Sequence, residues 1–135
     1  MLFAELEVGQ AAEFTKTVTE TDVVMYAGIT GDFNPMHVNQ TYAQGTQFGG
    51  RIVHGMLTAG FISAVLGMKL PGEGSIYMSQ SLRFTRPVRI GDTITARIEV
   101  IELFPQKKRV RLATACRNQD GAVVLDGEAL VLMQA

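Results

Sequence analysis

The sequence predicts an α+β fold: one domain over residues 1–135, in which a curved antiparallel sheet wraps around a central helix. Two observations predict it. One long segment is apolar on every helical face, and the segments after it alternate between apolar and polar residues. A helix that is apolar all round must be buried, and alternating strands need a core to cover. Folding the sheet around the helix is the economical way to satisfy both requirements.

The central helix is predicted over residues 55–68. The apolar side chains of this segment leave no polar stripe, and they are Met56, Leu57, Phe61, Ile62, Val65, Leu66 and Met68. Pro71 and two glycines follow and close the helix. We therefore expect this helix to be covered on nearly every side.

The strands are predicted from two-residue periodicity. A short strand lies around residues 13–18, and the later strands occupy residues 82–85, 94–100, 109–112 and 123–131. Asp120-Gly121 signals a hairpin turn between the last two strands. Since the edges of such a sheet are open to a second copy of the chain, we expect a homodimer.

Smaller elements are predicted between the first strand and the central helix. Thr19 or Thr21 can cap a helix, and Asp22 stands three residues after Thr19, as in a capping box. Gly28 and Gly31 are expected to end that helix. We expect a loop over residues 31–37, a helical turn over 39–43 and an irregular loop over 44–51.

The composition excludes several classes of function. Lys plus Arg is 12 and Asp plus Glu is 13, which argues against a broad surface for nucleic acid or anionic membrane. The one cysteine, Cys116, excludes an intrachain disulfide and a cysteine metal cluster, and we expect it to be a plain buried thiol. The longest uncharged stretch, residues 54–68, is shorter than the ~20 residues of a spanning helix. We expect a soluble, cytoplasmic protein.

The segment that carries chemistry contains Asp32 and His37, five residues apart on a loop stiffened by Asn34 and Pro35. A carboxylate and an imidazole at this spacing suit acid–base work on one bound water. Taken alone, the pair also fits a loop in which Asp32 caps a turn and His37 is solvated. The other histidine, His54, is expected to be structural and hydrogen-bonded to the backbone at the start of the central helix.

Three stretches of the sequence resemble the MaoC-like (R)-specific enoyl-CoA hydratases, or hydratase 2 family. The first is Gly31-Asp32-x-Asn34-Pro35-x-His37, with Tyr26 before it and Ala43 after it; Met36 replaces the usual aliphatic residue. The second is Phe48-Gly49-x-x-Ile52-Val53-His54-Gly55-Met56-Leu57, and the third is Phe84-x-x-Pro87-Val88-x-x-Gly91-Asp92. The fold that this resemblance implies is the hot dog, a sheet wrapped around a helix.

The resemblance implies reversible hydration of a trans-2-enoyl-CoA to the (R)-3-hydroxyacyl-CoA, without metal or cofactor, since coenzyme A is part of the substrate. Asp32 and His37 would hold the water, with Asp32 as base and His37 supplying or relaying the proton. Gly55 would offer its amide to the thioester oxygen, and Ser63 would lie beside the pair. Leu66 and Val131 are possible acyl-pocket residues on the resemblance alone. Acyl length and direction in the cell, whether degradation, polyester precursor supply or biosynthetic dehydration, stay open.

Several alternatives remain. The chain could be a hot-dog thioesterase, a dehydratase acting on acyl carrier protein thioesters, or a non-catalytic partner subunit. Ser63 could bond a carbonyl of its own helix, Gly55 could simply permit close packing, and Tyr26 is expected to pack in the core. Two groups of basic residues are expected to be solvated rather than bound to coenzyme A phosphates; they are Lys107, Lys108, Arg109 and Arg111, and Arg83, Arg86 and Arg89.

Overall fold

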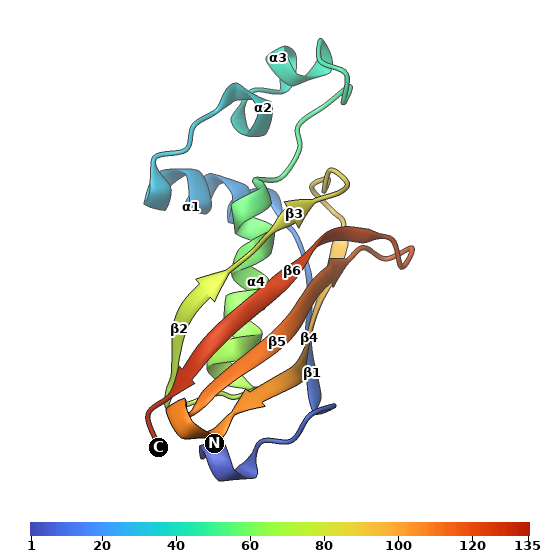
Figure 1. The fold of residues 1–135 in the computed structure, drawn as a ribbon. Coiled ribbons are helices and arrows are strands. Elements are labelled where there is room, and N and C mark those ends of the chain that lie inside the picture. Colours follow the sequence, from blue (N-terminus) through green and yellow to red (C-terminus); the bar gives the residue numbers. More distant parts are fainter.

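Helix α4 (Gly55–Met68) forms the axis of the computed structural model, which describes residues 1–135, and an antiparallel sheet curves around it (Figure 1). The helix has the predicted bounds. The expected α+β architecture is therefore confirmed, with one central helix enclosed by the sheet.

The sheet is antiparallel throughout and has the strand order β1-β4-β5-β6-β2, with the short β3 also paired to β6. Its strands are β1 (Ala11–Thr17), β2 (Ser75–Gln80), β3 (Arg83–Phe84), β4 (Thr93–Phe104), β5 (Arg109–Arg117) and β6 (Val123–Met133). The short helical turn η2 (Pro105–Lys107) joins β4 to β5, and the predicted turn at Asp120-Gly121 joins β5 to β6.

The inner face of the sheet carries the core. Along β4 every second residue is fully buried, and these residues are Ile94, Ala96, Ile98 and Val100, as the alternation predicts. On β5 the buried face ends at Cys116, whose thiol is free and buried as expected. Burial raises the pKa of the Cys116 thiol to about 12. A thiol in this state is a packing group rather than a nucleophile.

The strand predicted before β4 was wrong, at the edge of the sheet that lies next to α4. The sequence placed one strand over residues 82–85, whereas the structure has β2 over Ser75–Gln80 and only two residues in β3. Consecutive apolar residues of β2, Ile76, Tyr77 and Met78, are all exposed. Because the strand does not alternate between a buried and a polar face, periodicity could not reveal it.

The prediction that α4 is covered on nearly every side was also wrong for a single chain. Met56, Gly60, Ser63 and Gly67 form one exposed stripe along the helix, next to the edge strand β2. Met56 is 55% exposed and Met68 is 82% exposed. The sheet curves around the rest of the helix and leaves this stripe open.

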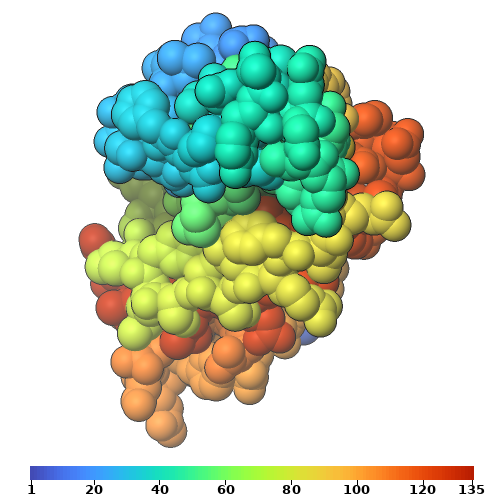
Figure 2. All heavy atoms as spheres, turned by 90° about the horizontal axis from the view of Figure 1, so that it is seen from above, coloured from blue at the N-terminus to red at the C-terminus, as the bar shows by residue number.

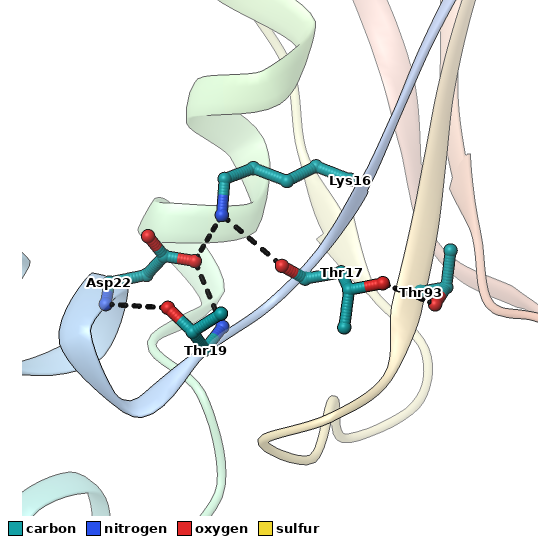
Figure 3. A network of polar contacts seen from close by, with 5 residues as sticks. All are labelled: Lys16, Thr17, Thr19, Asp22 and Thr93. Atoms are coloured by element: carbon teal, nitrogen blue, oxygen red, sulfur yellow. Dashed lines mark hydrogen bonds and ion pairs between the residues drawn. The ribbon is translucent and has the colours of Figure 1, made fainter.

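Helix α1 (Glu20–Thr30) begins with the predicted capping box (Figure 3). The Asp22 N–H donates to Thr19 Oγ1 at 3.2 Å, and the Thr19 N–H donates to the Asp22 carboxylate at 2.9 Å. The Lys16 ammonium also bonds this carboxylate and, together with the Thr19 N–H, lowers the pKa of Asp22. Thr19, rather than Thr21, is therefore the cap, and Lys16 ties β1 to the start of the helix.

Three short helices cover the N-terminal end of α4 (Figure 1). Besides α1 they are α2 (Pro35–Val38) and α3 (Gln40–Gln44). Two predictions are corrected here. Helix α1 continues through Gly28 and ends only at Gly31, whose φ of 83° suits a left-handed cap. Residues 35–37, expected in a loop, belong to α2, because proline is favoured at the first position of a helix. None of the helices has the combined length and hydropathy needed to cross a membrane.

Candidate active site

A pocket of about 500 Å³ opens at the N-terminal end of α4, beside α2 and the loop before it. Its lining includes Asp32, His37, His54, Gly55, Phe84 and Arg86. In Figure 2, which looks down on this end, the hollow lies between the teal segment of α2 and α3 and the yellow segment that follows β2. The pocket thus gathers both predicted dyad residues with the start of the central helix.

Asp32 lies on the short loop between α1 and α2, and its backbone is held from both sides. Its N–H donates to Thr30 Oγ1 at 3.2 Å, and its carbonyl oxygen accepts a hydrogen bond from His54 Nε2 at 3.0 Å. The Asp32 Oδ1 atom accepts the Asn34 N–H at 3.2 Å. The other carboxylate oxygen makes no hydrogen bond within the chain, so the carboxylate can accept a proton from a bound molecule.

His37 is the third residue of α2. Asn34 caps this helix by accepting the Met36 N–H at 3.1 Å, and Pro35 occupies the first helical position. His37 Nδ1 lies 2.7 Å from the carbonyl oxygen of Ile52. A carbonyl can only accept, so Nδ1 carries the hydrogen and the neutral ring keeps its lone pair on Nε2.

His54 is 1% exposed and hydrogen-bonded to the backbone, as expected for a structural residue at the start of α4. The sequence did not predict its neighbours. Its ring stacks on His37, with ring centroids 3.9 Å apart and planes 30° apart. Tyr26 of α1 packs against it at 4.6 Å and also contacts the core. Burial, followed by the nearby His37, lowers the pKa of His54, so its imidazole is neutral.

Gly55 is the first residue of α4, and its N–H makes no hydrogen bond within the chain. The first N–H groups of a helix are free to bind an oxygen with negative charge. A Cβ atom at Gly55 would lie 2.6 Å from Cε1 of Phe84, which is closer than real contacts allow. The aromatic ring therefore packs directly over this glycine, and both readings of Gly55, amide donor and packing, fit its position.

Asp32, His37 and His54 each offer one ligand atom, and these atoms lie within 4.8 Å of one another. Such a set has the residue types of a metal site as well as of an acid–base site. The hydrogen bonds at His37 Nδ1 and His54 Nε2 already use one nitrogen of each ring. The expectation that no metal takes part stays a prediction.

Three predicted site residues lie outside this pocket. Ser63 is on the exposed stripe of α4 and lines a second hollow beside β2, so within one chain it is not brought next to Asp32 and His37. Leu66 and Val131 are buried in the core cluster and do not line the pocket. Their proposed roles stay predictions.

The basic residues separate into different environments. Arg83 is exposed and pairs with Asp126 at 3.3 Å, as a solvated residue would. Arg111 forms ion pairs with Glu102 and Glu128 and does not line the pocket. Arg86 differs from both. It is exposed, as expected of a solvated residue, but it has no ion pair and lines the pocket.

The fold and the site together define a class. A sheet wrapped around one helix is the hot-dog fold, and here Asp32 and His37 line a pocket at the N-terminal end of that helix. A model of the MaoC-like domain matches residues 4–120, and the chain belongs to this family.

The comparisons with individual proteins agree. The chain is 53% identical to an (R)-specific enoyl-CoA hydratase of Rhodospirillum rubrum, over 98% of this chain and 92% of the relative. It is also 53% identical to a 3-hydroxybutyryl-CoA dehydratase of Methylorubrum extorquens, over 97% of this chain and 83% of the relative. The solved structure of the R-hydratase PhaJ1 from Pseudomonas aeruginosa superposes with a TM-score of 0.93 at 50% identity, over 98% of this chain and 84% of that one.

Proposed function

We propose that this chain is an (R)-specific enoyl-CoA hydratase whose water is activated by Asp32 and His37. The reaction is the reversible hydration of a trans-2-enoyl-CoA to the (R)-3-hydroxyacyl-CoA, the kind of chemistry for which both curated relatives are named. The observation that supports the role of the pair is its geometry. A free carboxylate oxygen and a histidine held with its lone pair on Nε2 line one pocket.

The chemistry needs a group that takes a proton and a group that delivers one. In the hydration direction, an O–H bond of water breaks, its oxygen bonds to C3, and C2 gains a proton. Asp32 takes a proton from the water and passes it to the lone pair on His37 Nε2, and His37 delivers it to C2, so the pair returns to its starting state after each turnover.

Negative charge develops on the thioester oxygen when water adds to C3. The Gly55 N–H is free at the start of α4, where the helix dipole favours such charge. This N–H lies in the same pocket as the dyad. We assign it the role of hydrogen-bond donor to the thioester oxygen.

Arg86 is the residue of this pocket that suits the phosphates of coenzyme A. It is exposed, it carries no ion pair, and a guanidinium binds phosphate oxygens well. A phosphate contact with Arg86 favours coenzyme A, which contains a diphosphate, as the carrier of the acyl group. The acyl chain can then enter the apolar part of the pocket.

The active form is proposed to be a homodimer. The exposed stripe of α4 lies beside β2, the edge strand whose apolar residues Ile76, Tyr77 and Met78 are exposed. A second copy of the chain would cover both the stripe and the open edge. Light scattering at micromolar concentration tests this, and a monomer would refute it. Cell fractionation tests the expected cytoplasmic location.

The test of the function is an assay of the purified protein on trans-2-enoyl-CoA thioesters of increasing chain length. We expect loss of the enoyl absorbance and an (R)-3-hydroxyacyl product, unchanged after treatment with a chelator. Release of free thiol without loss of enoyl absorbance would show a thioesterase instead. An (S) product would refute the proposal, and faster turnover of acyl carrier protein thioesters would identify that carrier as the substrate form.

A further inference from the structure

His54 is placed where it can control the geometry of the dyad, although the resemblance assigns it no role. It precedes α4 at the N-cap position, yet its side chain makes no capping hydrogen bond. The imidazole instead turns toward the loop between α1 and α2. This one side chain contacts Tyr26 of α1, Asp32 of the loop and His37 of α2. It joins three separate elements to the start of the central helix.

The protonation of His54 follows from its partners. Nε2 lies 3.0 Å from the carbonyl oxygen of Asp32, which can only accept, so Nε2 carries the hydrogen. Nδ1 is buried and has no hydrogen-bond partner. A second proton at Nδ1 would bury an unpaired cation. The ring is therefore a neutral donor fixed in one tautomer.

The neutral charge of His54 matters for His37, because the two rings stack on each other. The His37 ring lies on the His54 ring at a centroid distance of 3.9 Å. When His37 carries a proton during turnover, a neutral aromatic face beside it is favourable. A second positive charge at that distance would oppose protonation of His37.

We infer that His54 is a positioning residue for the dyad: its Nε2–H fixes the backbone of Asp32, and its ring is the platform on which His37 rests. This inference deepens the proposed function and depends on it for its kinetic consequences. His54 itself does not touch the reacting atoms in this role. It sets the relative position of the two side chains that do.

The kinetic test compares three substitutions of His54. His54→Leu removes the donor and the ring, His54→Phe keeps an aromatic platform, and His54→Gln keeps a side-chain donor. We expect His54→Leu to lower kcat by about 10- to 100-fold, as a small displacement of catalytic groups does, with KM changed by less than about twofold. The other two variants each recover part of this loss. Ile98→Val, a conservative core substitution on β4 away from the pocket, is the control and keeps the wild-type kcat.

Two results with these variants would overturn the inference. If His54→Leu lowers the melting temperature while the folded enzyme keeps its kcat, His54 only stabilises the fold. A loss of the same size in all three variants, with no recovery by either partial replacement, would also contradict the two-part role.

A second measurement does not depend on activity or on the folding of any variant. The chain has two histidines, so nitrogen-15 spectra of the imidazoles of the wild-type protein contain two sets of signals. The titratable groups that face His54 are Tyr26, Asp32 and His37, and Arg86 lines the same pocket. We expect His54 to keep the Nε2–H tautomer and to stay neutral as the pH falls through 6.5, the ordinary value for histidine. An Nδ1–H tautomer, or titration near the ordinary value, would refute the inference.

The two experiments separate the inference from the proposed function. If the wild-type protein does not hydrate crotonyl-CoA, the proposed function fails, and the spectra still decide the tautomer and the charge of His54. If the protein is active and the spectra or the variants disagree, the inference alone fails.

Discussion

His37 Nδ1 donates a hydrogen bond to the carbonyl oxygen of Ile52 over 2.7 Å. The Ile52 N–H in turn donates to the carbonyl oxygen of Met36 at 3.2 Å, so α2 and the segment before α4 bind each other in both directions. This contact fixes the tautomer of His37 and leaves Nε2 with a lone pair. A histidine held in this way can accept and release a proton at a defined place, which acid–base catalysis requires.

The dyad is tested by replacing each member. Asp32→Asn keeps an oxygen that can accept the Asn34 N–H, and His37→Ala removes the imidazole. Each change should lower kcat/KM for crotonyl-CoA by about 10²- to 10⁴-fold, as loss of an acid–base group does. The melting temperature should change little. Asp120→Asn, in the exposed hairpin turn, serves as the matched control. Wild-type turnover in both dyad variants would refute the assignment.

The role of Gly55 is tested together with Phe84. Gly55→Ala places a Cβ atom against a ring that is 52% exposed and can swing aside. We expect kcat to fall about tenfold or more, as when an oxyanion donor is disturbed, with a small change in melting temperature. Alanine keeps the backbone N–H, so the loss that we expect beyond the clash with Phe84 comes from the methyl group standing beside this N–H in the pocket, and the double variant with Phe84→Ala should not recover the turnover of Phe84→Ala alone. Full recovery would mean that Gly55 serves only to make room for the ring.

The phosphate contact of Arg86 is tested with two substrates. Arg86→Ala should raise KM for crotonyl-CoA roughly five- to tenfold, the loss of about one charge-assisted hydrogen bond, with kcat unchanged. A crotonyl thioester of N-acetylcysteamine has no phosphates and should show no difference. Arg83→Ala is the control, because Arg83 pairs with Asp126 and does not line the pocket. An equal effect on both thioesters would contradict the assignment.

The capping box of α1 contributes to stability. Thr19→Ala and Asp22→Ala should each lower the free energy of unfolding by about 1 kcal/mol, measured by urea denaturation. Thr21→Ala, an exposed change in the same turn, should cost less. The pKa of Asp22 is lowered in the folded state, so its stabilisation is present above the ordinary value of 3.8 and is lost as the pH falls below it. Wild type and Asp22→Asn should therefore converge in stability at low pH.

His54 also makes the stability depend on pH, in this case through a buried base rather than an acid. Its pKa is lowered in the folded state from the ordinary value of 6.5, so the unfolded chain binds more protons below that pH. The stability of the wild type should therefore fall as the pH decreases from about 6.5 to 5, before most carboxylates titrate. The difference between wild type and His54→Gln, measured by urea denaturation, should change over this window. A difference that is constant over this range would contradict the buried neutral state.

The elements that follow from local patterns were predictable from the sequence. Helix α4 has its predicted bounds because a run of apolar residues ends at Pro71 and the glycines. The inner face of β4 follows from its strict alternation, which requires only neighbouring residues to recognise. Asp32 and His37 stand out through the resemblance of their loop to the MaoC-like hydratases, since the pair alone also fits a turn cap and a solvated ring.

The tertiary structure decided what depends on residues distant in the sequence. The stacking of His54 on His37, the choice of tautomer by Ile52 and the place of Arg86 at the pocket all arise where separate segments meet at the start of α4. Strand β2 became visible only through its pairing with β6. Hydrophobic periodicity reports how one segment is buried, whereas the protonation and position of a catalytic group depend on the atoms that the fold brings against it.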